Sequence, residues 1–412
     1  MEELFEEEPD RYSSLLAQIY FGLAMNYKEL GKKEEALQIF ENTINLLEVL
    51  IEENKDAWQN LFFNTCLTSA QIYETEGQFE EILQVLSKIE DSLKTSYEEN
   101  DEQYEGFYNY YNVLTAIANN GLGMITYKQE QYEKAIEYFS KARDCEEIYY
   151  EITGQRKPAL ATDYMNLAHS YNNLNKKQEA LLNALKALSL REKLFNEDKK
   201  YANDFAYSNH FIGSLYYNEK LKGSLPFFKR YLDLKDYMDE KCYAVGVNNL
   251  MKVYDMEIEM EFDNIEKCRI LHEDKIDAIK KYMNDADNYL HAYAMAHYRY
   301  GLYLHKKNEK DANKYLIQSI EYMEELVKED NKKMLSLADF YQLVVPLVEP
   351  IDRAIDYAEK AVIILEKIVE EDKTQNRFLE NAYVVLMGFY EKNNQVEEAN
   401  HVKEKLEKLK GN

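Results

Sequence analysis

A helical pattern returns along the chain at a nearly constant interval, and it constrains the fold more than any other feature. Within residues 20–44, Ala24 and Tyr27 belong to a run of apolar and small residues with helical spacing, which ends at Gly31. A second run with the same spacing begins around Ala36. Two amphipathic runs joined by a short turn predict an αα-hairpin, in which alanine lets the helices approach closely.

Copies of this hairpin pattern cover the whole sequence. One anchor in each second helix defines nine copies: Ala36, Ile82, Ala135, Ala180, Ser224, Cys268, Ala312, Ala354 and Ala399. Successive anchors are 42 to 53 residues apart, with a mean near 45. A single hairpin cannot bury its apolar face, so neighbouring copies must stack on one another. The sequence therefore predicts an all-α solenoid of about nine helix-turn-helix repeats, with residues 1–412 as one domain.

The predicted repeats follow an acidic lead-in at residues 1–13. They are centred near residues 14–52, 56–95, 105–152, 159–198, 202–238, 242–284, 288–330, 334–371 and 375–410. Four irregular places interrupt them: the tyrosine-rich segment 90–111, the Gly- and Pro-containing loop 153–158, the segment 255–263, and the prolines Pro346 and Pro350. Acidic and apolar residues alternate with the period of a strand in 255–263, and the prolines should break a helix. We interpret these places as joints between repeats.

Copies one, three, four and five show most clearly a common order: aromatic residue, leucine, small residue and tyrosine, then a turn, then alanine, aromatic residue and alanine. This order resembles the tetratricopeptide repeat, although the period exceeds the roughly 34 residues usual for that family. Residues 161–202 resemble the kinesin-light-chain-type variant most, with Asn166-Leu167-Ala168 in the place of its Asn-Leu-Ala, and residues 248–250 carry the same Asn-Asn-Leu. The resemblance implies a right-handed superhelix whose first helices line a concave groove, where first-helix asparagines hold a ligand's backbone.

Composition excludes several other classes. Glycine and proline number only 13 and 5 among 412 residues, too few turn-formers for a β-sandwich, barrel or propeller. The 50 basic and 76 acidic residues give a net charge of −26, which repels nucleic acids and anionic membrane surfaces. The same field favours a basic protein or peptide as partner. A hydrophobic content of 46% is sufficient for a large core.

The sequence contains no segment typical of export or membrane insertion. Residues 1–10 are acidic and lack an apolar stretch, and the apolar run 343–348 is short and broken by Pro346. The four cysteines are far apart and form no CxxC pair, so we expect neither a disulfide framework nor a zinc site. A cytoplasmic protein that binds neither membrane nor nucleic acid is the expectation, and the sequence leaves its oligomeric state open.

Signals for catalysis or cofactor binding are missing from the sequence. Neither GxGxxG nor the P-loop pattern occurs, and the HExxH pattern that His272 could begin lacks its second histidine. Residues 255–259 imitate the start of a calcium loop, but Met260 stands where the turn requires glycine. We interpret the many carboxylates as parts of solvated helix faces. We expect a protein that is not an enzyme and that holds no cofactor or metal.

A polar but largely uncharged stripe runs along the predicted first helices. We predict that it forms the partner-binding groove, with these residues: Asn120, Tyr127, Asn166, His169, Asn173, His210, Tyr217, Asn248, Asn249, Tyr298 and Arg299. A solvated face in this chain would carry Glu and Lys, whereas Asn, His and Tyr offer donors and acceptors for an extended peptide. The alternative interpretation is a general enrichment of the chain in Asn and Tyr.

Two functions fit these features. The first is a non-catalytic scaffold that holds a segment of a partner protein in the groove. The second is a sensor module, in which ligand binding changes the superhelix and thereby controls an effector chain, as in signal-peptide regulators or defence and stress sensors. We interpret the tyrosines of 104–111 as packing between repeats, with a recognition patch as the alternative.

Overall fold

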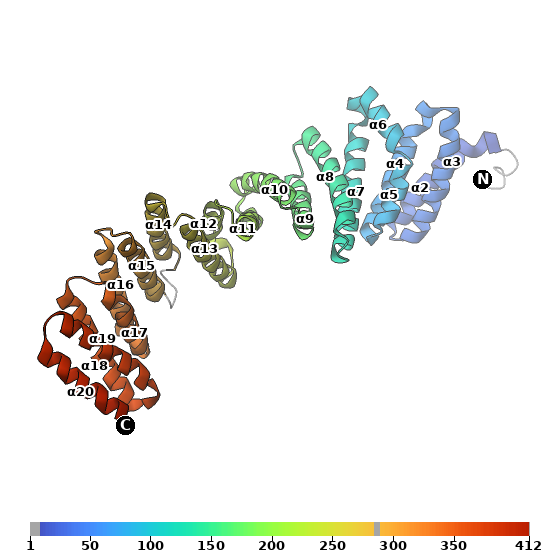
Figure 1. Cartoon of the computed structure of the whole chain (residues 1–412). Helices are drawn as coiled ribbons and strands as arrows, with labels where there is room; N and C mark the ends of the chain where they lie inside the picture. Colours follow the sequence, from blue (N-terminus) through green and yellow to red (C-terminus); the bar gives the residue numbers. More distant parts are fainter. Residues whose placement is uncertain (1–8, 284–288, 412) are drawn as a thin grey trace. The chain divides into compact units, whose positions relative to one another are not determined.

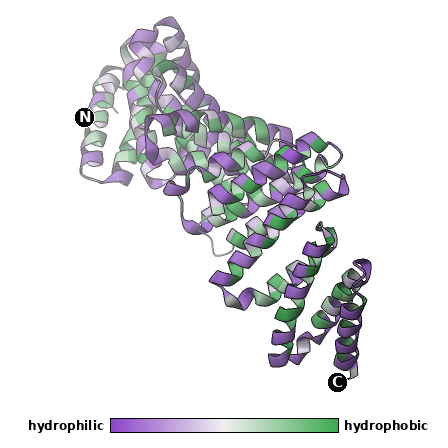
Figure 2. Cartoon of the chain, turned by 90° about the vertical axis from the view of Figure 1, so that its left-hand side faces the viewer, coloured by the Kyte–Doolittle hydropathy of each residue, from purple (hydrophilic) through white to green (hydrophobic). Residues whose placement is uncertain are grey.

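The computed structural model describes residues 9–283 and 289–411, and within them all regular structure is helical (Figure 1). This agrees with the predicted all-α class. The part of the lead-in at residues 1–8 lies outside the described residues, and the first helix begins at Pro9 rather than after residue 13. Single helices carry both hydrophilic and hydrophobic residues along their length, as amphipathic helices do (Figure 2).

Along residues 9–283 and 289–411, first and second helices alternate in nine successive repeats. The first helices are α2 (Pro9–Glu29), α4 (Lys55–Glu76), α7 (Asp101–Lys128), α9 (Lys157–Asn173), α11 (Ala202–Asn218), α13 (Glu240–Met260), α15 (Tyr289–Lys306), α17 (Met334–Val344) and α19 (Asn376–Lys392). The second helices are α3 (Lys33–Glu53), α5 (Phe79–Ser87) with α6 (Glu90–Glu99), α8 (Tyr132–Thr153), α10 (Lys177–Glu197), α12 (Leu225–Leu232), α14 (Ile265–Met283), α16 (Ala312–Glu329), α18 (Ile351–Glu371) and α20 (Val396–Gly411). Short 3-10 helices are η1 (Lys199–Tyr201), η2 (Lys235–Tyr237), η3 (Asn331–Lys333), η4 (Val345–Leu347) and η5 (Lys373–Gln375).

These elements belong to two compact units. Unit 1 contains the described residues up to Glu219 together with Asp236–Met238, and unit 2 contains Lys220–Lys235 and the described residues from Asp239 onward. The expectation of one continuous domain over residues 1–412 stays a prediction.

The hairpins of unit 1 pack through small residues at the helix crossings. Ala24 and Ala36, at the predicted crossing of α2 and α3, are both fully buried beside Phe40. In α7, a Cβ added to Gly123 would lie 2.6 Å from ring atoms of the buried Phe139 of α8, so the two helices approach as closely as glycine permits. The predicted small residues therefore set the distance between helices.

The turns inside the hairpins explain why the chain needs so little glycine. Gly31 and Gly77 adopt the left-handed conformation after their first helices, with φ of 73° and 70°. After five other first helices that conformation is adopted by residues other than glycine: Glu130, Asn175, Lys220, Asn308 and Asn394. After most of these turns the next backbone N–H returns to a carbonyl of the last helical turn, as from Lys32 to Tyr27 over 2.9 Å. This bond caps the helix end. The residues other than glycine adopt the left-handed conformation at a modest cost in backbone strain.

The four predicted irregular places have different outcomes. The extra length before repeat three is taken up by α6 and by the 28-residue α7. The predicted loop 153–158 is shorter than expected, since α8 ends at Thr153 and α9 already begins at Lys157. The strand-like period of 255–263 was wrong as a structural signal, because α13 continues through Met260 with Glu257 facing inward. The prolines do end α17, which stops at Val344 before η4.

The tyrosines of 104–111 largely pack between repeats. Tyr104 and Tyr111 are 6% and 8% exposed, and the Gln59 amide donates a hydrogen bond to the Tyr104 hydroxyl. Tyr108 stacks on Tyr97 with ring centroids 4.4 Å apart. These contacts join α4, α6 and α7 in one core.

Unit 2 has its own apolar core. Residues of α15 to α20 form one cluster of buried side chains, among them Leu316, Tyr341 and Leu365. In α15, a Cβ at Gly301 would lie 2.8 Å from the Leu316 side chain of α16, which repeats the glycine contact of unit 1. The hairpin design is therefore the same in both units.

Candidate functional site

The predicted groove residues all lie on first helices, distributed over both units. Seven belong to unit 1: Asn120 and Tyr127 on α7, Asn166, His169 and Asn173 on α9, and His210 and Tyr217 on α11. Four belong to unit 2: Asn248 and Asn249 on α13, and Tyr298 and Arg299 on α15.

In unit 1, two of these positions connect α7 with α9, the first helix of the next repeat. The Asn120 amide donates to Oδ1 of Asp163, a residue that is 3% exposed. The Asn173 amide donates to the Tyr127 hydroxyl over 2.8 Å. Burial raises the pKa of Asp163 to about 7, and the bond from Asn120 limits this increase. These amides are therefore engaged in joining neighbouring repeats.

His169 connects α9 with α11 in the same way. Its Nε2 lies 2.8 Å from the Tyr207 hydroxyl, and its ring meets the Phe211 ring edge to face at 4.4 Å. Burial, with a smaller contribution from the positive charge of Arg191, lowers the pKa of His169 to about 4. The imidazole is consequently neutral near pH 7, where it donates or accepts one hydrogen bond at each nitrogen.

A pocket of about 310 Å³ lies among the helices that carry these residues. It is lined by Met124, Tyr127, Phe139, Thr162, Met165, Asn166, His169, Arg191 and Tyr207. Three predicted groove residues, Tyr127, Asn166 and His169, therefore meet at one pocket, whereas the other four of unit 1 do not line it.

Asn166 differs from its neighbours in this pocket. Its side chain is partly exposed, and within the described part of the chain its amide has no hydrogen-bond partner. The amides of Asn120 and Asn173 are occupied, as shown above. Asn166 therefore presents both a donor and an acceptor to anything that enters the pocket.

Arg191 reaches the pocket from the second helix α10. It is 6% exposed, and its Nη1 donates to the Asp204 carbonyl over 3.1 Å and to Ser208 Oγ over 2.9 Å. Burial lowers the pKa of this guanidinium. Arg191 is not among the predicted groove residues, although an arginine inside the apolar face of a second helix is a usable signal of a buried polar contact.

The two remaining positions of unit 1 lie further along α11. His210 is partly exposed, and burial lowers its pKa. Tyr217 is also partly exposed. Neither lies at the pocket described above.

In unit 2, the predicted residues of α15 contact neighbouring first helices. Arg299 Nη1 lies 3.0 Å from Asp255 Oδ1, and this carboxylate also accepts a 2.6 Å hydrogen bond from the buried Lys275. Tyr298 meets the Phe340 ring edge to face at 5.6 Å. On α13, Asn248 is exposed and Asn249 is partly exposed.

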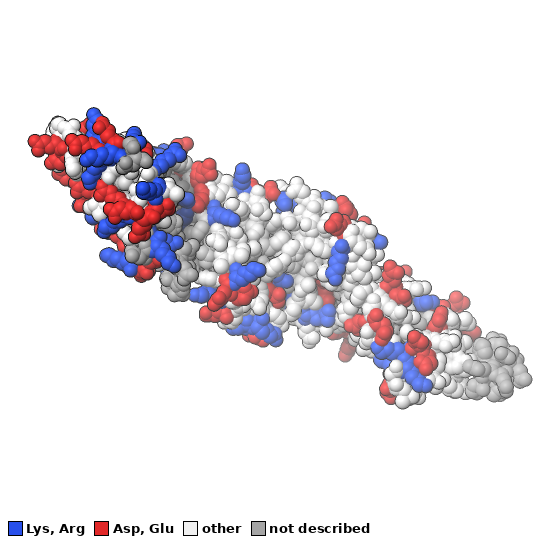
Figure 3. Space-filling view, turned by 90° about the horizontal axis from the view of Figure 1, so that it is seen from below, with Lys and Arg blue, Asp and Glu red and all other residues white. Residues whose placement is uncertain are grey.

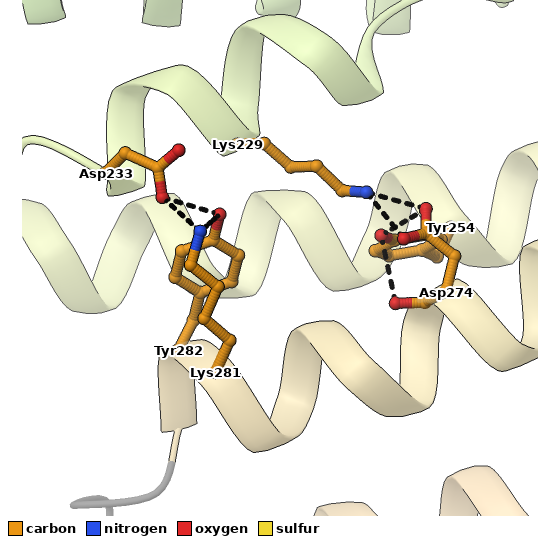
Figure 4. Close-up of polar contacts among 6 residues, drawn as sticks. All are labelled: Lys229, Asp233, Tyr254, Asp274, Lys281 and Tyr282. Atoms are coloured by element: carbon orange, nitrogen blue, oxygen red, sulfur yellow. Dashed lines mark hydrogen bonds and ion pairs between the residues drawn. The ribbon is translucent and has the colours of Figure 1, made fainter.

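A second polar cluster in unit 2 joins α12, α13 and α14 (Figure 4). Lys229 Nζ lies 2.7 Å from both carboxylate oxygens of Asp274, and the Tyr254 hydroxyl donates to the same carboxylate over 2.9 Å. Asp233 accepts from Lys281 Nζ at 2.6 Å and from the Tyr282 hydroxyl at 2.8 Å. Every carboxylate of this cluster has a cation beside it, so the cluster stabilises the packing of three helices.

The buried His272 of α14 makes the stability of unit 2 depend on pH. Its ring stacks on Tyr300 with centroids 4.9 Å apart, and its Nε2 has no hydrogen-bond partner among the described residues. Burial, helped by the charge of Lys275, lowers its pKa from 6.5 to about 4. Between these values the unfolded chain binds more protons than the folded one, so stability falls as pH falls through this range.

We therefore expect His272→Phe to remove part of the acid sensitivity of the protein. From about pH 7.5 to about pH 4.5 the wild type should lose about 2 kcal/mol more unfolding free energy than the variant. Urea denaturation across this pH range measures the difference. Parallel curves for the two proteins would contradict the assignment of a neutral, buried His272.

Two features of the described residues bear on other functions. In residues 9–283 and 289–411, no group of three or more His, Cys, Asp and Glu side chains is arranged to hold a metal ion. Across the same residues, no helix has the length and apolar character needed to cross a membrane.

The stacked αα-hairpins define a helical repeat protein, and comparison with protein families identifies the repeat. Models of the tetratricopeptide repeat match residues 17–46, which cover most of α2 and part of α3, and residues 114–193, which extend from α7 into α10. The chain is thus a tetratricopeptide repeat protein, as the sequence pattern predicted. Among curated proteins, none is significantly similar to this chain in sequence.

Several solved structures are distantly similar. Aspartyl phosphate phosphatase F from Bacillus subtilis is 15% identical, over 97% of this chain and 94% of that chain, with a TM-score of 0.31. The apo quorum sensor NprR from B. thuringiensis is 16% identical, over 93% and 99%, with a TM-score of 0.27. NprR in complex with its cognate peptide NprX is 14% identical, over 96% and 98%, with a TM-score of 0.29. These values are too low to transfer a function to this chain.

Proposed function

We propose that unit 1 binds an extended segment of a partner protein along α7, α9 and α11, as a non-catalytic scaffold. The observation that carries this proposal is the free amide of Asn166 at the pocket where three predicted groove residues meet. A side-chain amide offers one donor and one acceptor, which matches the N–H and C=O of an extended backbone.

The surroundings of Asn166 support such a role. Tyr127 and His169 are held by bonds to Asn173 and Tyr207, so their rings are fixed before a ligand arrives. Met124 is 38% exposed and Tyr207 is 48% exposed, and both offer apolar surface at the pocket. A peptide would therefore bind to a largely preformed surface. The Asn166 amide would form two hydrogen bonds with it, and the surrounding side chains would supply apolar contacts.

We expect Asn166→Leu to weaken peptide binding by about tenfold or more, because two hydrogen bonds to the ligand backbone are lost. Peptides are first selected on the wild-type chain from a phage-displayed random library. Their dissociation constants for wild type and variant are then measured by calorimetry.

Asn203→Leu provides the matched control. Asn203 is an exposed residue of α11 that does not line the pocket, and the substitution is chemically the same. It should leave the affinity within about twofold of wild type. Selected peptides that bind both variants equally well would show that the groove assignment is wrong.

The predicted preference for basic partners is part of this proposal. Acidic residues exceed basic ones by 76 to 50, and on the face drawn in Figure 3 charges of both signs are interspersed with wide uncharged areas. The net field attracts a positively charged peptide over long distances. Asn248, Asn249, Tyr298 and Arg299 remain proposed contacts in unit 2, and a cytoplasmic location remains an expectation.

The alternative, a sensor that controls an effector chain, is supported by the division into two compact units. A sensor should transmit binding beyond the helices that contact the peptide. Amide hydrogen exchange distinguishes the two functions. Protection confined to α7, α9 and α11 on peptide binding indicates a scaffold, whereas altered exchange in unit 2 indicates a sensor.

A further inference from the structure

We infer that the pocket of unit 1 takes the carboxylate of an acidic side chain, above all glutamate, and pairs it with Arg191. The inference deepens the proposed function and rests on it, since the bound peptide segment must bring this side chain to the pocket. It names the chemistry of one anchor residue in the ligand.

The first argument is that Arg191 has no ion-pair partner. Two other buried charges do: Glu146, 2% exposed, is paired with Arg156 at 2.6 Å, and Lys275, 6% exposed, is paired with Asp255 at 2.6 Å. Arg191 is equally buried. The negative charge of Asp204 acts on it, but the direct contact is to the Asp204 backbone carbonyl, and Arg191 forms no ion pair with a carboxylate among the described residues. Burying a cation without an anion in direct contact is costly, and an anion from the ligand would relieve this cost.

The second argument is the number of unused donors. A guanidinium has five N–H groups, and the hydrogen bonds of Arg191 to Asp204 and Ser208 all come from Nη1. Those two bonds fix the orientation of the guanidinium against α11. Arg191 lines the pocket, and its Nε and Nη2 groups make no hydrogen bond among the described residues, so a carboxylate in the pocket can accept two parallel hydrogen bonds from them.

The third argument is the character of the pocket walls. Met124, Phe139 and Met165 provide apolar surface, which suits the methylene groups of a glutamate side chain. Asn166 and Tyr207 add polar groups around the same space. A volume of about 310 Å³ exceeds the needs of a lone carboxylate and accommodates a complete side chain. A long acidic side chain is therefore a better fit than a small free anion.

The proposed anchor is compatible with the net charge of −26. The negative field acts on the whole ligand and favours a peptide that is basic overall. The pocket acts on one side chain at short range, where a desolvated arginine dominates. A peptide with one glutamate among basic residues satisfies both conditions.

The test uses the full chain and small probes, with the Arg191 Nε–H resonance as the readout. The resonance is assigned by its loss in Arg191→Met. N-acetyl-glutamate amide carries only a side-chain carboxylate, and N-acetyl-glutamine amide is its neutral match. We expect the glutamate probe to shift this resonance with about tenfold higher affinity than the glutamine probe. Equal effects of the two probes, or no effect of either, would overturn the inference.

Two further probes separate the sources of an anion. N-acetyl-alanine carries only a terminal carboxylate, and inorganic phosphate is a free anion. Tighter binding of either one than of N-acetyl-glutamate amide would overturn the assignment to an acidic side chain. These comparisons use the wild-type protein, and loss of the resonance in Arg191→Lys assigns it if Arg191→Met folds poorly.

The failures of the two proposals are distinguishable. A library that yields no binding peptide would contradict the proposed function. The probe comparison would still show whether Arg191 binds the carboxylate of an acidic side chain. Selected peptides that bind at Asn166 but lack an acidic residue would overturn the inference and leave the proposed function standing. With peptides that contain glutamate, Arg191→Met should weaken binding by about tenfold or more, and replacement of that glutamate by glutamine should do the same.

Discussion

Replacing Arg156 by methionine is expected to destabilise unit 1 by about 2 to 3 kcal/mol near pH 8. Arg156 is the N-cap residue directly before α9, and its guanidinium holds the carboxylate of Glu146 through three contacts of 2.6 to 3.1 Å. Glu146 is 2% exposed, whereas the Arg156 side chain is 31% exposed. Methionine keeps the apolar stem and leaves the buried carboxylate without its cation. Urea denaturation of both proteins measures the loss.

Because Glu146 is buried, we expect two further results. Glu146→Gln should cost less than Arg156→Met, about 1 kcal/mol, because the freed arginine can reach water. The double variant should recover most of the loss, since glutamine needs no cation. Equal losses for the two single variants would contradict this account.

Much of the fold was predictable because one structural unit is repeated. The anchors of the second helices fall in the observed second helices or directly before them, as with Ser224 before α12. Repetition averages out the weak local signals that make single helices hard to place. The segment 255–263 failed as a strand signal because a few alternating residues do not outweigh the helical pattern that precedes them.

The candidate site was less predictable, because sequence periodicity gives the face of a helix but not the partner of a side chain. Asn120, Asn173 and Asn166 share one stripe, yet only the contacts of the folded chain show that two are engaged and the third is free. Arg191 lies on a second helix, outside the stripe considered for binding. Its entry into the pocket depends on how α9, α10 and α11 pack, which no local pattern encodes.

The distance between paired helices rests on a few glycines, and their replacement gives opposite results at different sites. Gly22 of α2 is exposed, and a Cβ there would have open space. Gly22→Ala should stabilise the protein by about 0.5 to 1 kcal/mol, because alanine loses less conformational entropy in a helix. Gly123 of α7 has ring atoms of Phe139 only 2.6 Å from the position of a Cβ.

Gly123→Ala is therefore expected to destabilise unit 1 by about 2 to 3 kcal/mol, because the fully buried Phe139 ring has no free space to move into. Thermal and urea denaturation of the two alanine variants should give shifts of opposite sign. The cause can be isolated by repeating Gly123→Ala in a Phe139→Leu background, where the smaller side chain leaves room for the methyl group. The cost of Gly123→Ala should then fall by at least about 1 kcal/mol. If it stays the same, close approach to Phe139 is not what keeps glycine at this crossing.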